Sequence, residues 1–155
     1  MNQVAVFVAS FGYVGFFPIA PGTAGSAAAL ALFAFVRWVG LPAFELAVIA
    51  AVGAIGVWAA SGTEVALGRK DPGVVVIDEV LGMLITLALL PVSIAGVVLG
   101  FVLFRIYDVI KPYPAGRLES LQGGLGIMAD DAMAGIYAYL TLRACVWMWP
   151  AWLTA

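Results

Sequence analysis

Residues 80–104 read VLGMLITLALLPVSIAGVVLGFVLF, and this apolar run decides how the chain is arranged. Pro91 lies near its centre, where a proline removes a backbone hydrogen bond and kinks or ends a helix. The run is therefore either one kinked helix or a hairpin, in which residues 80–90 enter an apolar environment and residues 94–104 return. At about 1.5 Å per residue, each arm of the hairpin crosses roughly half to two-thirds of the ~30 Å hydrocarbon core of a bilayer.

The two alternatives place the flanking acidic residues differently. A single helix would carry Asp78 and Glu79 to one membrane face and Asp108 to the opposite face. A hairpin gathers all three carboxylates on one side, and it agrees with the distribution of basic residues described below. We therefore expect a short hairpin that is broken at Pro91.

The composition of the whole chain indicates an integral membrane protein. Of its 155 residues, 65% are apolar and only 10% are Asp, Glu, Lys or Arg, whereas about 25% are charged in an ordinary soluble domain. The mean hydropathy is +1.11. So few charges cannot cover a soluble globule, and so much apolar sequence excludes a disordered chain. We expect a single membrane-embedded domain over residues 1–155.

Two further features of the composition exclude whole classes of function. The chain has no histidine and one cysteine, Cys145, which excludes histidine general bases, the usual zinc sites and an intrachain disulfide. We interpret Cys145 as a packing residue. With 9 acidic and 7 basic residues and no basic patch, the chain is also not expected to bind nucleic acid.

The remaining apolar runs predict further helices. Residues 26–41 form the first long run, and residues 43–67 are long enough to span a bilayer. A last helix is expected to start near residue 130 and to run to about residue 149. The fold predicted from these patterns is an all-α membrane bundle of about five helices.

Most of the charged residues are expected at one face of this bundle. The basic residues placed there by the hairpin are Arg69, Lys70, Arg105, Lys111 and Arg117. By the positive-inside rule, this face is cytoplasmic. It also carries seven carboxylates, which are Asp71, Asp78, Glu79, Asp108, Glu119, Asp130 and Asp131.

Two pairs of neighbouring carboxylates point to a metal ion. Asp78–Glu79 and Asp130–Asp131 both adjoin long apolar segments, and adjacent carboxylates repel each other unless positive charge lies between them. Mg²⁺ prefers such oxygen ligands together with the oxygens of a bound phosphate. Asp108 and Lys111 are three residues apart and can share a helix face, either as part of such a site or as a structural ion pair.

Glycine-rich segments before two helices add an argument for phosphate. Residues 21–26 read PGTAGS and open a helix, so backbone N–H groups and the hydroxyls of Thr23 and Ser26 can bind an anion. Residues 123–126, which read GGLG, precede the acidic pair of the last helix in a similar way. Neither segment matches the P-loop or the dinucleotide pattern. Together with the carboxylates, they favour metal-assisted chemistry on a phosphate at the membrane surface.

Four ordered motifs in this chain closely resemble those of the phosphatidylglycerophosphatase A family, over about residues 11–140. They are PIAPGTAGS at 18–26, IDEVLGM at 77–83, FRIYDVIKPYP at 104–114 and GGLGIMADD at 123–131. The resemblance implies an all-helical, Mg²⁺-dependent lipid phosphatase. Such an enzyme converts phosphatidylglycerophosphate to phosphatidylglycerol and phosphate in the bacterial inner membrane, and here its active face would be cytoplasmic.

The resemblance also implies roles for the polar residues that match the family's motifs. As catalytic residues we expect Asp78, Glu79, Asp108 and Asp131. As metal ligands we expect Asp78, Glu79, Asp108, Asp130 and Asp131, and as phosphate-binding residues Thr23, Ser26, Arg105 and Lys111. Which carboxylate serves as base or nucleophile, and the oligomeric state, stay open.

A small proton-coupled transporter is the alternative function, because carboxylates within a membrane often mark such proteins. A carrier would place its acidic residues near the middle of the bilayer and would be built from a repeat. In this chain the acidic residues lie at helix ends on one expected face, and no repeat is evident. A purely structural membrane subunit is a third possibility, but it leaves the clustered aspartates unexplained.

Overall fold

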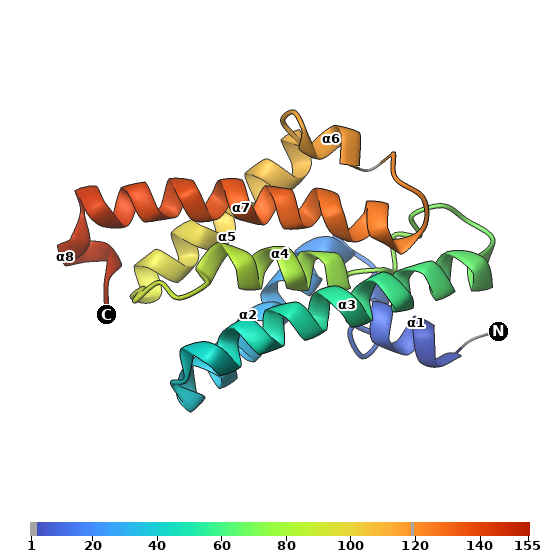
Figure 1. The fold of residues 1–155 in the computed structure, drawn as a ribbon, viewed down its shortest axis with the longest axis horizontal. Coiled ribbons are helices and arrows are strands. Elements are labelled where there is room, and N and C mark those ends of the chain that lie inside the picture. The colour runs from blue at the N-terminus through green and yellow to red at the C-terminus, as the bar shows by residue number, and fades with distance from the viewer. Residues whose placement is uncertain (1–2, 119) are drawn as a thin grey trace.

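In the computed structural model, which describes residues 3–118 and 120–155, helices form the framework of the protein (Figure 1). The helices are α1 (Gln3–Ala9), the 3₁₀ helix η1 (Val14–Phe16), α2 (Pro21–Val39), α3 (Pro42–Leu67), α4 (Ile77–Leu87), α5 (Ile94–Ile110), α6 (Ala115–Leu118), α7 (Gly124–Met148) and α8 (Pro150–Leu153). The all-α prediction is confirmed. Glu119 lies outside the described residues.

The predicted number of about five helices is wrong, because the described ranges contain eight α-helices. The additional helices are short: α1 has 7 residues, and α6 and α8 have 4 each. Helices of one or two turns carry no long apolar run, which is why hydropathy alone does not reveal them.

Two helices begin earlier than the sequence pattern predicts. The α2 helix starts at Pro21, a position where the missing N–H costs nothing, so Thr23 and Ser26 lie inside the helix and not before it. The α7 helix starts at Gly124 and not near residue 130. The Gly124 N–H donates to Ser61 Oγ at 2.8 Å, and a side chain at this position would collide with the α3 backbone. This contact fixes the start of α7 against α3.

The chain breaks near Pro91, as the hairpin prediction requires. The α4 helix ends at Leu87, and Leu89 adopts a left-handed conformation with φ of 55°. Ser93 then caps α5 by accepting the Gly96 N–H at 3.3 Å. The buried Glu45 of α3 stabilises the turn between α4 and α5, because its Oε1 accepts the Leu89 N–H at 2.8 Å. The two arms therefore bring the start of α4 and the end of α5 to the same end of the molecule.

The α4 helix is the buried centre of the bundle. In Figure 1 it lies beside α7 and α3, and it also packs against α2 and α5. Its apolar side chains form a core with Phe104 of α5 and Leu142 of α7. Most residues of α4 are buried, including Asp78 in its first turn, whereas Glu79 beside it is half-buried. Polar groups at that position therefore face protein and not lipid.

A glycine contact sets the distance between α4 and α7. Gly82 and Gly135 lie against each other, so that a Cβ on Gly135 would lie 2.5 Å from the Gly82 carbonyl oxygen. Each glycine follows an aspartate by four residues, which is about one helical turn. The close approach of the backbones thus brings Asp78 and Asp131 opposite each other.

Two of the helices, α2 and α3, are long and apolar enough to cross a membrane. Large apolar side chains point outward from both helices, including Trp38 and Val65, which are 81% and 85% exposed. An outward-facing apolar surface of this kind is typical of a helix in contact with lipid.

Candidate active site

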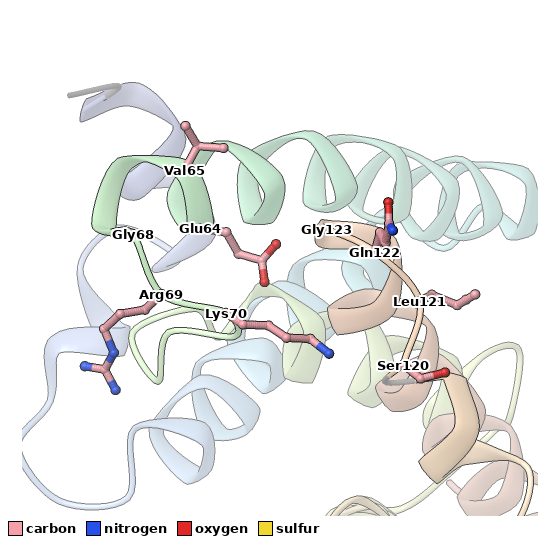
Figure 2. A pocket seen from close by; sticks show the side chains of 9 residues that line it. All are labelled: Glu64, Val65, Gly68, Arg69, Lys70, Ser120, Leu121, Gln122 and Gly123. Atoms are coloured by element: carbon pink, nitrogen blue, oxygen red, sulfur yellow. The ribbon is translucent and has the colours of Figure 1, made fainter.

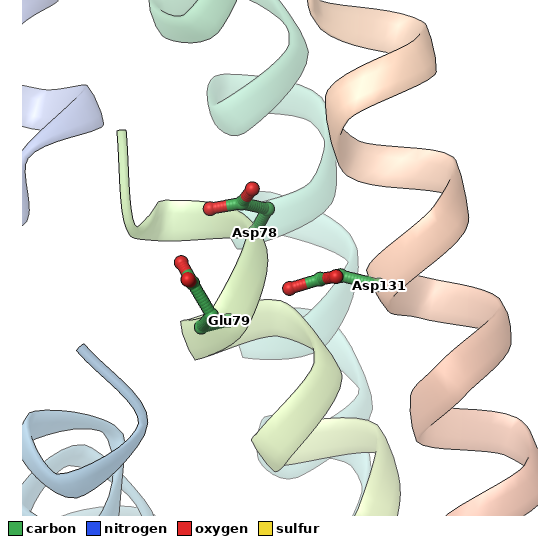
Figure 3. A group of neighbouring side chains, drawn as sticks. All are labelled: Asp78, Glu79 and Asp131. Atoms are coloured by element: carbon green, nitrogen blue, oxygen red, sulfur yellow. The ribbon is translucent and has the colours of Figure 1, made fainter. Parts of the chain in front are cut away.

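Three carboxylates from two helices meet where α4 begins. Asp78 and Glu79 lie in the first turn of α4, and Asp131 projects toward them from α7 (Figure 3). One oxygen from each carboxylate lies within 4.8 Å of the other two. We call these three residues the acidic triad.

Each member of the acidic triad has one buried oxygen without a hydrogen-bond partner among the described residues. These atoms are Asp78 Oδ1, Glu79 Oε2 and Asp131 Oδ2. A buried polar atom without a partner is costly, and three close carboxylates also repel one another. The arrangement fits a hard divalent cation, because such an ion takes carboxylate oxygens as ligands.

Burial and mutual repulsion change the acidity of the α4 carboxyls. Both carboxyls lie in the first turn of α4, which has 11 residues and a length of about 16 Å, so this helix does not span a bilayer. Burial raises the pKa of Asp78 well above its ordinary value, and the carboxylates of Glu79 and Asp131 raise it further. Burial also raises the pKa of Glu79, and Asp108 adds to this effect, whereas Arg105 opposes it.

Two basic side chains flank the acidic triad, and each is paired with another aspartate. Arg105 Nη1 lies 2.6 Å from Asp108 Oδ2 and 3.9 Å from Glu79 Oε1. Lys111 Nζ lies 2.6 Å from Asp130 Oδ2. Asp108 and Asp130 are thus ion-paired, Glu79 of the triad also contacts Arg105 through its Oε1, and Lys111 pairs with Asp130 of α7.

The residues of the PGTAGS segment take two different positions. Ser26 is fully buried, donates to the Gly22 carbonyl at 2.8 Å and accepts from Arg105 Nη1 at 3.4 Å. Its hydroxyl therefore orients Arg105. Thr23 is exposed, and it is not among the residues that line the cavity described next. Direct phosphate binding by either hydroxyl stays a prediction.

The five carboxylates expected as metal ligands and the two basic residues expected to bind phosphate all line one cavity of about 420 Å³. Its lining residues are Ala20, Pro21, Gly22, Asp71, Gly73, Val75, Asp78, Glu79, Arg105, Asp108, Val109, Lys111, Ile127, Asp130 and Asp131. The cavity thus contains carboxylate oxygens, which can bind a metal ion, and two positive side chains, which can bind a phosphate.

Gly22 and Asp71 also line this cavity, although no role was predicted for either. Position 22 has no room for a side chain, because a Cβ there would collide with Glu79 Oε1 and lie 3.2 Å from Arg105 Nη1. Asp71 comes from the polar loop after α3, where its N–H donates to Glu64 at 2.9 Å. Gly22 lies within a quoted motif and Asp71 lies outside all four, and only the folded arrangement places both in the cavity.

The loops around the cavity lie at one end of the molecule. Arg69 and Lys70 line a neighbouring hollow together with residues 120–123, just before α7 (Figure 2). Arg37 lies at the far end of α2, 3.9 Å from Glu45, which in turn binds the α4–α5 turn. Arg37 is therefore separated from the basic residues around the cavity.

Comparisons with known proteins identify relatives of this chain. The sequence profile of the phosphatidylglycerophosphatase A family matches residues 7–146. A phosphatidylglycerophosphatase A of Escherichia coli K12 is 38% identical over 138 residues, which cover 88% of this chain and 80% of the relative. A phosphatidylglycerophosphatase A of Haemophilus influenzae is 35% identical over 152 residues, covering 96% and 92%.

A third relative has a different name. A Bacteroides thetaiotaomicron protein, provisionally named a phosphatidylinositol-3-phosphatase, is 36% identical over 141 residues, covering 86% of this chain and 88% of the relative. No solved structure matches the chain.

These relatives define the class of the protein as a phosphoric monoester hydrolase, and its described residues form an all-helical framework. The extent of the profile match and the identity to two named enzymes settle the family. The chain belongs to the phosphatidylglycerophosphatase A family.

Proposed function

We propose that this phosphatase hydrolyses phosphatidylglycerophosphate to phosphatidylglycerol and phosphate, with Mg²⁺, at the cytoplasmic face of the bacterial inner membrane. The observation that carries the proposal is the acidic triad with its three unpartnered oxygens, in the same cavity as Arg105 and Lys111. The names of the Escherichia coli and Haemophilus influenzae relatives support the choice of substrate.

The donor set fits Mg²⁺. The acidic triad offers three carboxylate oxygens from α4 and α7, and the ion-paired Asp108 and Asp130 lie in the same cavity. When bound, Mg²⁺ supplies a Lewis acid for a phosphoryl oxygen and lowers the pKa of a bound water. We assign the triad as its principal ligands and keep Asp108 and Asp130 as further candidates.

The residues of the cavity have separate tasks in the hydrolysis. Arg105 and Lys111 bind the oxygens of the terminal phosphate, and Ser26 holds the Arg105 guanidinium in place. A cavity carboxylate accepts a proton from the attacking water as the water oxygen bonds to phosphorus. The bond between phosphorus and the glycerol oxygen breaks, and that oxygen takes up a proton to give phosphatidylglycerol. Inorganic phosphate is the other product.

Several observations support the membrane location. In the most apolar windows of α2 and α3, only 28% and 22% of the residues are buried inside the protein, so these helices present apolar surface outward. The basic loops lie around the cavity end, which the positive-inside rule assigns to the cytoplasm. In this orientation the lipid headgroup reaches the cavity while its acyl chains stay in the bilayer.

The proposal is tested by phosphate release from lipid monoesters. Purified protein in detergent is expected to release phosphate from phosphatidylglycerophosphate with Mg²⁺ and to lose this activity in EDTA, with recovery when excess Mg²⁺ is added. Full activity in EDTA would exclude the metal assignment.

The substrate itself is tested in parallel with phosphatidic acid, lysophosphatidic acid and phosphatidylinositol 3-phosphate. A preference for the inositol lipid would replace the proposed substrate with the one named for the Bacteroides thetaiotaomicron relative. The transporter alternative gains no support, because the named relatives are phosphatases and the acidic residues line a cavity at one end of the bundle.

A further inference from the structure

The outer face of α5 carries an apolar stripe that leads to the acidic cavity. Its exposed side chains recur at helical spacing and are Val98, Val102, Ile106 and Val109. From the first to the last of these residues, the stripe measures about 16 Å at 1.5 Å per residue, or about half of a ~30 Å hydrocarbon core. The stripe therefore has the depth of one lipid leaflet.

A shallow hollow of about 450 Å³ lies on the C-terminal part of this stripe. Its lining residues are Phe101, Val102, Arg105, Ile106, Val109 and Ile110. Arg105 and Val109 also line the acidic cavity, so the apolar hollow and the acidic cavity share a border. A ligand can occupy both without leaving the surface of the protein.

Arg105 marks the border between the two environments. Its Nη1 faces the polar side, 3.4 Å from Ser26 Oγ and 2.6 Å from Asp108 Oδ2. On the other side of Arg105, the hollow is lined by apolar side chains alone. A ligand that fills both hollows must be anionic on one side of Arg105 and apolar on the other, as a phospholipid with a phosphomonoester is.

The geometry points to an acyl-chain site on α5, in which the apolar hollow holds one acyl chain of the substrate lipid while the phosphate lies in the acidic cavity. This inference rests on the proposed function and adds how the lipid is held. Val102 and Ile106 contact the chain, and the substrate enters sideways from its leaflet. The site makes the enzyme selective for a lipid over the same headgroup without acyl chains.

Filling the hollow tests this selectivity. Ile106→Trp places a large side chain in the hollow at a position that is 44% exposed. We expect the ratio of kcat/KM for long-chain phosphatidylglycerophosphate to kcat/KM for its deacylated form to fall at least tenfold. The matched control is Leu140→Trp, at a 57% exposed position on α7, which should keep the wild-type ratio. An unchanged ratio in Ile106→Trp, or an equal fall in both variants, would overturn the acyl-chain site.

A second measurement does not depend on turnover. Phosphatidylglycerophosphate with a photoreactive group on one acyl chain is crosslinked to the full-length protein by a short flash, and the adducts are mapped by mass spectrometry. We expect adducts concentrated on residues 98–109 that unlabelled lipid suppresses. Adducts spread evenly over the exposed faces of α2, α3 and α5, without suppression, would show only contact with bulk lipid and would overturn the proposal. Suppressed adducts without phosphate release would instead refute the proposed function and leave the acyl-chain site standing.

Discussion

Asp78 and Asp131 approach each other from different helices, and each has a buried oxygen without a hydrogen-bond partner among the described residues. Asp78→Asn or Asp131→Asn removes a negative charge and a proposed metal ligand without changing the size of the side chain. We expect kcat/KM to fall at least about a hundredfold, equivalent to about 2.7 kcal/mol. Phosphate release and Mg²⁺ titration measure the effect.

The control for these variants is a buried acid at the other end of the molecule. Glu45 lies in the first turn of α3 and does not line the cavity. Glu45→Gln keeps an oxygen that can accept the Leu89 N–H. It should retain activity while losing the ion pair with Arg37. If Asp78→Asn and Asp131→Asn both keep full activity, the acidic triad is not the site.

The raised pKa of Asp78 predicts that protons compete with Mg²⁺. A raised carboxyl pKa means that the proton stays bound to higher pH, and the metal binds only the deprotonated form. Mg²⁺ affinity should therefore rise with pH and be lost as the pH falls through the raised pKa. Calorimetry at several pH values, in buffers of different ionisation enthalpy, should detect proton release on binding. An affinity that does not vary with pH would contradict the assignment of Asp78 as a ligand.

For the charged residues of the cavity, the sequence predicted which side chains lie together but not which of them form ion pairs. Four motifs separated by long apolar segments identified nearly every charged residue of the cavity. The spacing of Asp108 and Lys111 suggested that they share a helix face, but Lys111 ends α5 in a left-handed conformation with φ of 46°. Its side chain therefore reaches Asp130, and Asp108 pairs with Arg105 instead. Helical spacing does not hold beyond the last helical residue.

The contact between α4 and α7 depends on two glycines. Gly135→Ala would place a methyl group against the Gly82 backbone and force the helices apart. We expect a loss of about 1–3 kcal/mol in the free energy of unfolding, as in other overpacked contacts, and weaker Mg²⁺ binding because the acidic triad opens. Thermal unfolding in detergent, with and without Mg²⁺, measures both effects.

Gly53→Ala on α3 is the matched control for this change. A Cβ there would meet only the Leu81 methyl groups, at an ordinary 3.8 Å. This variant should unfold at or above the wild-type temperature, because alanine favours a helix more than glycine does. Equal behaviour of the two variants would show that the glycine contact does not set the geometry of the site.

The helices themselves were predictable to different degrees. The break at Pro91 and the long α3 helix follow from local chemistry, because proline interrupts a helix and an apolar run of this length forms one. The starts of α2 and α7 were placed too late. Glycine-rich segments are normally read as turns, whereas here the glycines allow one helix to lie close against its neighbours. That choice depends on tertiary contacts that no local pattern contains.

We expect the end of the molecule that holds the cavity to lie in the cytoplasm. The turn between α2 and α3 should lie on the opposite side of the membrane. In a Cys145→Ser background, cysteines at positions 73 and 116 are expected to react with an impermeant reagent only from the cytoplasmic side. Leu41, which is 60% exposed at the turn between α2 and α3, provides a reporter for the other side when replaced by cysteine. Labelling of positions 73 and 116 from opposite sides would contradict the hairpin orientation.

The separation of the acidic triad along the chain has a consequence for biogenesis. Asp78 and Glu79 leave the ribosome well before Asp131, with the whole of α5 and α6 synthesised in between. During that interval α4 cannot yet be covered by α7, the helix that buries much of its surface. The nascent chain therefore cannot assemble the complete acidic triad until the last long helix is inserted. A protein truncated before α7 would be not only less stable but unable to offer all three carboxylates to the proposed cation.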